Sequence, residues 1–215
     1  MLKCRGVTFS PLFADREDAG RRLADELPTL DDPIVLALPR GGVPVAAALA
    51  LAIGAPLDVF VVRKLGVPMQ PELAMGAVAS GGVRVVNEDV LRDAGVPPAV
   101  LEEVTARERA AVEARERRYR GDRPEPRLAL RELVLVDDGL ATGATMRAAV
   151  EAVRKREPTR VVVAVPVAPT GTVASFARDG VEIACVHASD DFVSVGSWYR
   201  DFGQVTDEEV IRLIS

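Results

Sequence analysis

The run from residue 133 to residue 150 reads LVLVDDGLATGATMRAAV. Four apolar residues lead to two adjacent aspartates, then to a loop of glycine, alanine and threonine, and finally to a run with apolar residues at helical spacing. This order predicts a buried strand, a turn and a helix. Asp137 and Asp138 could cap the turn, but one cap does not require two aspartates at the end of a buried strand. We therefore expect this acid pair to bind a ligand.

A similar order recurs upstream. PIVLAL (33–38) is an apolar run of strand length, followed by PRGG (39–42) and by a small-residue helix over 43–54. LDVFVV (57–62) predicts a second buried strand, which runs into two basic residues. Apolar strands that alternate with helices form parallel crossover units covered on both faces, so we predict an open, mostly parallel α/β sheet flanked by helices. Further expected elements are helices over 15–27, 143–156, 170–178 and from about Asp207, and strands over 160–167 and 181–187.

The middle of the chain interrupts this alternation. The segment from Gly66 to Asn87 holds two short apolar stretches that could pair as a hairpin across Gly81 and Gly82, and we expect it to be a mobile excursion. Residues 98–120 predict a highly charged helix with a thin apolar stripe, which either packs through one narrow face or serves as a lid or a dimer contact. The stripe consists of Leu101, Val104, Ala111 and Val112.

Length and composition limit the class of protein. With 215 residues, 48% of them hydrophobic, the chain suits a single domain. It has no apolar run of the roughly 20 residues that a membrane helix needs, and its first residues lack a signal-peptide core, so we expect a cytoplasmic protein without membrane contact. Cys4 and Cys185 are the only cysteines, and we expect both to be packing residues. The net charge of -5 argues against a DNA-binding surface but permits a local basic pocket.

The turn after the acid pair predicts an anion site. Backbone amides at the N-terminus of a helix, with the hydroxyl groups of Thr142 and Thr145, form a cradle for a phosphate group. An ATP-binding P-loop is excluded, because no lysine lies between Lys64 and Lys155. The two aspartates suit ribose hydroxyl groups or a hydrated Mg2+ ion. Phosphoribosyl pyrophosphate carries a phosphate, a diol and a metal-binding pyrophosphate, and would use all of these groups.

The run VLVDDGLATGAT resembles the phosphoribosyl pyrophosphate signature of type I phosphoribosyltransferases. The resemblance implies transfer of a 5-phosphoribosyl group to a nitrogenous base, release of pyrophosphate, dependence on Mg2+, a role in nucleotide salvage and a homodimer. We expect one domain over residues 1–215, in which residues 66–125 form a flexible loop with a helical insertion and residues 188–215 form a small hood. The charged helix near 98–120 lies outside the family pattern and could serve as an extra lid.

The resemblance assigns roles to two further strand ends. PRGG is similar to the family's first loop, whose amides hold pyrophosphate, often beside a non-proline cis peptide, although alone it could be an ordinary tight turn. RKLGVP (63–68) resembles the segment that leads into the family's flexible loop, where the basic pair meets pyrophosphate, although it could be a solvated strand end. Glu72 is either the acid that deprotonates the base or an exposed loop residue.

The C-terminal part resembles the hood of hypoxanthine-guanine enzymes over ASDDFVSVGSWYRDFGQ (188–204). There Phe192 is expected to stack on the acceptor base, although the aromatics Trp198, Tyr199 and Phe202 could instead tie down the tail as a satellite cluster. His187 is expected to be a strand-end residue and not a catalyst.

The chain departs from those enzymes at two chemical positions. The lysine that reads the purine there, on the strand before the hood, has no counterpart in VVVAVPVAPT (161–170). Ala141 stands where they carry an aspartate that acts as general base, so a non-catalytic sensor of phosphoribosyl pyrophosphate or a nucleotide is the alternative to an enzyme. We expect the loop 39–42 and the turn 142–145 to share one cleft. The expected catalytic residues are Asp137, Asp138, Arg63 and Lys64, with Mg2+ at the two aspartates; the expected substrate-binding residues are Arg40, Gly41, Gly42, Gly139, Leu140, Ala141, Thr142, Gly143, Ala144, Thr145 and Phe192.

Overall fold

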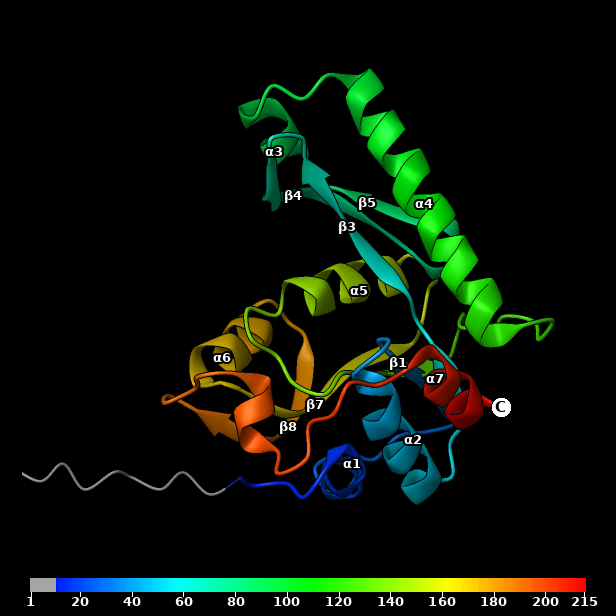
Figure 1. Ribbon diagram of the computed structural model, residues 1–215, viewed down its shortest axis with the longest axis vertical. Helices are drawn as coiled ribbons and strands as arrows, with labels where there is room; N and C mark the ends of the chain where they lie inside the picture. Colours follow the sequence, from blue (N-terminus) through cyan, green and yellow to red (C-terminus); the bar gives the residue numbers. More distant parts are fainter. Residues whose placement is uncertain (1–10) are drawn as a thin grey trace, which may run out of the picture.

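The computed structural model describes residues 11–215 and is built around a five-stranded parallel sheet (Figure 1). The strand order is β2-β1-β6-β7-β8, and every neighbouring pair is parallel. This confirms the predicted α/β architecture. The strands are β1 (Pro33–Ala37), β2 (Leu57–Val59), β6 (Glu132–Val136), β7 (Arg160–Pro169) and β8 (Glu182–Ser189).

Helices cover both faces of this sheet, which explains why its central strands are apolar at almost every position. In β1, Val35 and Ala37 join the core cluster beneath helices α1 and α2, whereas Ile34 and Leu36 join the cluster beneath α5 and α6. Figure 1 shows α1 and α2 on one side of the sheet and α5 on the other. The helices are α1 (Arg16–Ala24), α2 (Gly42–Ile53), α5 (Ala144–Arg154) and α6 (Thr170–Arg178).

A second, antiparallel sheet of three strands lies over α5 (Figure 1). Its order is β3-β4-β5, and Gly81 and Gly82, both at positive φ, connect the last two strands. This confirms the predicted hairpin. Regular pairing therefore extends through most of the segment expected to be a mobile excursion, and its mobility stays a prediction. The strands are β3 (Val62–Val67), β4 (Gln70–Ala79) and β5 (Val83–Val86).

The single strand predicted over residues 57–62 is wrong. Strand β2 ends at Val59, and β3 begins at Val62 in the other sheet. The two residues between them are buried and bonded to different partners: the amide of Phe60 donates to the Ala37 carbonyl, and that of Val61 to the Ser80 hydroxyl group. Apolar periodicity cannot detect this change of sheet, because Phe60 and Val61 are as buried as strand residues.

Helix α4 (Pro98–Arg120) has the predicted bounds and packs on β3 and β4. Leu101, Val104 and Val112 of its apolar stripe are buried, so the helix packs through this face as predicted, and a role as a lid or a dimer contact stays a prediction. A short helix that was not predicted, α3 (Glu88–Asp93), precedes it. Helix α7 (Asp207–Ile214) begins as predicted, capped by Thr206. Single 3-10 turns lie at Ser80–Gly82 and Val195–Trp198. None of the helices in the described part of the chain is both long and apolar enough to cross a bilayer.

Candidate active site

The acid pair follows the central strand β6, at the carboxyl edge of the parallel sheet. The Asp138 amide donates to Oδ1 of Asp137 over 2.9 Å. Burial raises the pKa of Asp137 well above its ordinary value, and the neighbouring charge of Asp138 raises it further. Burial also raises the pKa of Asp138, although Arg16 opposes this effect. A ligand that offers positive charge or hydroxyl donors would stabilise both carboxylates.

The loop after β1 packs directly against this acid pair. The peptide bond between Pro39 and Arg40 is a non-proline cis bond, of the kind that the family resemblance implies for this loop. A Cβ atom on Gly41 would lie 2.2 Å from Oδ2 of Asp138, and one on Gly42 would lie 2.8 Å from Cα of Asp137. Both positions therefore require glycine. At the start of α2, the amides of Gly42 and Val43 already donate to the carbonyls of Leu38 and Arg40. An anion at this loop would therefore meet the amides of Arg40 and Gly41.

The cradle after the acid pair, residues 139–145, combines buried anchors with exposed donors. Leu140 is buried, and Gly143 has φ 73° in a place where a Cβ atom would lie 2.7 Å from Phe176. A Cβ on Gly139 would lie 2.7 Å from Val195, so this position also needs glycine. The other members of the cradle, Ala141, Thr142, Ala144 and Thr145, are exposed at the start of α5. The cradle and the loop 39–42 thus flank the acid pair at one edge of the sheet.

The predicted basic pair reaches the same region from the second sheet. Arg63 and Lys64 lie within β3 and not at the end of a parallel strand, which corrects the expected position. They line a pocket of about 480 Å³ whose wall also includes Glu72 and, from the first turn of α5, Thr145. The structure therefore brings the basic pair and the cradle together. Arg40, by contrast, has its Nη1 atom 3.6 Å from Asp207 of α7.

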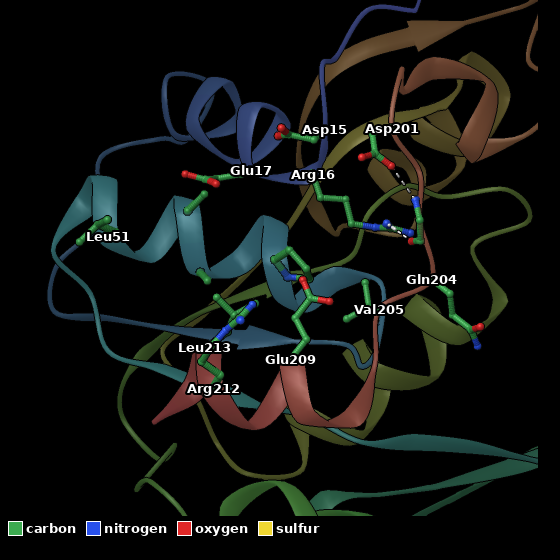
Figure 2. A pocket seen from close by; sticks show the side chains of 14 residues that line it. Asp15, Arg16, Glu17, Leu51, Asp201, Gln204, Val205, Glu209, Arg212 and Leu213 are labelled. Atoms are coloured by element: carbon green, nitrogen blue, oxygen red, sulfur yellow. Dashed lines mark hydrogen bonds between the residues drawn. The ribbon is translucent and has the colours of Figure 1, made fainter.

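One buried cation beside the acid pair was missed by sequence reasoning. Arg16 donates from Nε to Oδ2 of Asp138 over 2.9 Å and from Nη1 to the Gly203 carbonyl over 2.8 Å. Its guanidinium carbon lies 3.8 Å from the centre of the Phe202 ring. Figure 2 shows Arg16 extending along a pocket between α1, α2 and α7, which has a volume of about 530 Å³. Nothing in the sequence DREDAGRR distinguishes this arginine from its neighbours.

The charged helix α4 contributes two more residues that were missed. Oε2 of Glu108 lies 2.6 Å from Nε of Arg63, and its Oε1 lies 3.0 Å from Nε of Arg107. Burial raises the pKa of Glu108, but the hydrogen bonds and charges of the two arginines outweigh it and hold the pKa below its ordinary value. The sequence does not reveal that Glu108 is buried, because many similar charged residues surround it along the helix.

The aromatic residues of the C-terminal segment form a satellite cluster. Trp198 and Tyr199 are buried with Phe13, and Phe192 packs against them while partly exposed. The Tyr199 hydroxyl group donates to the Asp138 carbonyl over 2.6 Å, so the cluster also supports the acid pair. This favours the tail-anchoring interpretation for Trp198 and Tyr199, and leaves base stacking by Phe192 a prediction.

The histidine and the cysteine of the described chain pack within strand β8 and show no sign of a catalytic role. His187 lies within β8, with its ring centre 4.7 Å from that of Trp198. Burial raises the pKa of Cys185 to about 11, which agrees with an unreactive packing residue. Cys4 lies outside the described residues.

The acid pair has the number of carboxylates that a magnesium ion shared with a phosphate ligand would need. Over residues 11–215 there is no group of three or more His, Cys, Asp or Glu side chains that could hold a metal. Mg2+ needs only one or two protein carboxylates when substrate phosphate oxygens and water fill its other positions. Asp137 and Asp138 supply that number of carboxylates.

Comparison with known proteins places the chain in a family. Residues 15–175 match the phosphoribosyl transferase domain. The Mycobacterium tuberculosis H37Rv protein Rv0571c, provisionally named a phosphoribosyl transferase, is 46% identical over 205 residues, which are 94% of this chain and 46% of that protein. The chain thus spans about half the length of the curated relatives it matches.

Two solved structures share the fold of this chain. The crystal structure of TT1426 from Thermus thermophilus is 45% identical, covers 94% of this chain and 97% of its own, and has a TM-score of 0.86. A Neisseria gonorrhoeae protein crystallised with bound ppGpp shares the fold at 15% identity and a TM-score of 0.51, over 93% of this chain and 90% of its own. Since the domain match extends over most of the sheet and both sides of the candidate site, this chain belongs to the phosphoribosyltransferase family.

Proposed function

We propose that this protein transfers the 5-phosphoribosyl group of phosphoribosyl pyrophosphate to a nitrogenous base. The bond from the anomeric carbon to pyrophosphate breaks, a bond from that carbon to a base nitrogen forms, and the base loses a proton. One observation carries the proposal: the acid pair lies between the loop 39–42 and the cradle 139–145 at one edge of the sheet. A sugar with a phosphate at one end and pyrophosphate at the other matches that order.

Each part of the site has a role in this reaction. The exposed amides and hydroxyl groups of residues 142–145 hold the 5-phosphate, so binding energy remote from the reacting bond orients the sugar. The loop amides of Arg40 and Gly41, together with the side chains of Arg63 and Lys64, bind pyrophosphate and stabilise the charge that it gains on leaving. Asp137 and Asp138 accept hydrogen bonds from the ribose hydroxyl groups and balance the positive charge that grows on the ring.

Three further features belong to the proposal. Mg2+ bound beside Asp137 and Asp138 would supply positive charge that neutralises the departing pyrophosphate. Phe192 would stack on the acceptor base, and closure of the segment 66–87 would exclude water, which could otherwise hydrolyse the activated sugar. A homodimer is expected from the family resemblance.

A sensor of the same ligand is the second candidate. Ala141 offers no general base at the position where hypoxanthine-guanine enzymes carry one, and Arg16 already neutralises Asp138. The Neisseria gonorrhoeae protein of this fold binds ppGpp, a nucleotide with pyrophosphate groups. These observations favour testing binding and turnover separately.

The deciding experiment incubates the protein with phosphoribosyl pyrophosphate, Mg2+ and a panel of nucleobases, and measures pyrophosphate release. Calorimetry with phosphoribosyl pyrophosphate alone measures binding in parallel. An enzyme releases pyrophosphate only when a suitable base is present, and loses this activity in Asp137→Asn. Binding without base-dependent release would establish the sensor, whereas absence of binding would contradict both candidates.

A further inference from the structure

The pocket that holds the basic pair has one wall made by helix α4. Val104, Arg107 and Glu108 of α4 face Arg63 and Lys64 of β3 across about 480 Å³, and Thr145 at the start of α5 lies on the same pocket. The helix therefore does more than cover the second sheet. It adds charged side chains to the pocket of Arg63 and Lys64, the two residues to which the proposed function assigns pyrophosphate.

Glu108 accepts a hydrogen bond from the Nε atom of each of two arginines, Arg63 and Arg107. Its two carboxylate oxygens accept from Nε of Arg63 at 2.6 Å and from Nε of Arg107 at 3.0 Å. Within residues 11–215, neither guanidinium group has another hydrogen bond or ion pair. The terminal nitrogens of both arginines thus remain available, in an orientation set by the shared carboxylate.

The carboxylate is buried, whereas the two arginines that it binds reach the solvent. The Glu108 side chain is only 11% exposed, whereas those of Arg63 and Arg107 are 39% and 66% exposed. A buried carboxylate with two arginines on it is fixed in position, and fixed donors lose little freedom when they bind an anion. Planar guanidinium groups with two free nitrogens each are suited to phosphate oxygens.

We propose that Glu108 is a positioning residue that fixes Arg63 and Arg107 as a paired clamp for pyrophosphate, so that α4 completes the site. The proposal rests on the proposed function, because it assigns pyrophosphate to this pocket. Arg107 becomes a second binding arginine beside Arg63 and Lys64. Glu108 acts only through the two arginines and does not touch the ligand.

The direction in which Glu108→Gln changes the affinity for pyrophosphate distinguishes a positioning role from a purely electrostatic one. Glu108→Gln removes a negative charge from an anion pocket, and by charge alone it should tighten pyrophosphate binding. A glutamine, however, has only one accepting oxygen, so one arginine loses its anchor. We expect the Kd for magnesium pyrophosphate, measured by calorimetry, to rise about tenfold, which corresponds to about 1.4 kcal/mol.

A second ligand, a background that lacks both arginines and a control variant complete the test. Ribose 5-phosphate, which would use the cradle, should bind Glu108→Gln as it binds the parent protein, and Glu108→Gln should have little effect in an Arg63→Ala/Arg107→Ala background. Glu103→Gln removes the same charge from an exposed position of α4 and serves as the matched control. Arg107→Ala leaves the Arg63 pair intact, and should weaken pyrophosphate binding even if Glu108→Gln fails to fold.

Each contrary result has a distinct meaning. Unchanged or tighter pyrophosphate binding by folded Glu108→Gln, an equal loss in Glu103→Gln, or full affinity in Arg107→Ala overturns the clamp and leaves the proposed function standing. A parent protein that binds neither phosphoribosyl pyrophosphate nor pyrophosphate overturns the proposed function and the clamp together.

Discussion

Nε of Arg16 lies 2.9 Å from Oδ2 of Asp138, and both side chains are largely buried, with 11% and 15% exposed. The pair connects the first turn of α1 to the acid pair, and a second bond from Arg16 to Gly203 extends the connection to the C-terminal segment. Removal of one partner from a buried ion pair leaves an uncompensated charge. Arg16 is therefore a stabilising counter-ion at the centre of the site.

We expect Arg16→Ala to lower the free energy of unfolding by about 3–5 kcal/mol, the usual cost of breaking a buried pair. Urea denaturation measures the change. Arg21→Ala is the matched control, because Arg21 pairs with Glu17 on the same helix with both side chains more than half exposed, and such pairs contribute about 0–1 kcal/mol. The double variant Arg16→Ala/Asp138→Asn should be more stable than Arg16→Ala. Equal losses in Arg16→Ala and Arg21→Ala would contradict this role.

Asp137 should make the protein less stable as the pH rises. Burial and the charge of Asp138 raise its pKa, so the folded state binds more protons than the unfolded state between the two pKa values. Under that condition the free energy of unfolding falls with increasing pH across the interval. Asp137→Asn removes this loss and can still accept the hydrogen bond from the Asp138 amide.

The Tm of Asp137→Asn should therefore exceed that of the parent at about pH 8, and the difference should vanish near the ordinary aspartate pKa of about 4. For a chain of this size, each kcal/mol corresponds to roughly 2–4 °C. Calorimetric scans over pH give the comparison, with Asp191→Asn on the exposed hood as control. A Tm difference that stays constant with pH would show that the carboxyl group is not the cause. The same variant should fail to bind phosphoribosyl pyrophosphate.

Most of the fold could be predicted from the sequence, because strands that are buried on both faces consist almost entirely of apolar residues. Strands β1, β6 and β7 are covered on both faces and are apolar at almost every position, so their existence and parallel pairing follow from the run lengths and the helices between them. The boundary between β2 and β3 could not be predicted. Phe60 and Val61 are buried where the chain passes from one sheet to the other, and burial alone does not reveal the partner strand.

Gly143 should tolerate no side chain. Its φ of 73° is one that residues with a Cβ adopt at a cost of roughly 1–2 kcal/mol, and the added atom would lie 2.7 Å from Phe176. We expect Gly143→Ala to lower the free energy of unfolding by at least this amount and to weaken ribose 5-phosphate binding, because the turn must move. Gly171→Ala, in α6, has open space and no positive φ, and should be neutral. An unchanged phosphate affinity in Gly143→Ala would argue against the cradle.

The site was predictable where backbone geometry determines the residue type, and unpredictable where only side-chain charge is involved. Gly41, Gly42 and Gly143 are recognisable because neighbouring atoms leave no space for a Cβ. Arg16 and Glu108 are not, because each lies on a helix with many similar charges, and only the tertiary structure buries these two. An interpretation from motifs therefore finds the glycine positions of the candidate site but misses the charged side chains that are buried beside it.

Phe192 provides the test of base recognition. It packs on one side against the cluster of Trp198 and Tyr199 and is otherwise partly exposed, as a stacking surface must be. Stacking of a base on an aromatic ring contributes about 1–3 kcal/mol, so Phe192→Ala should weaken binding of a nucleoside 5'-monophosphate by roughly 5- to 150-fold. Ribose 5-phosphate, which lacks the base, should bind with unchanged affinity. Val193→Ala alters the neighbouring side chain, which is 86% exposed, and should affect neither ligand. If Phe192→Ala weakened both ligands equally, the side chain would support the hood and would not contact the base.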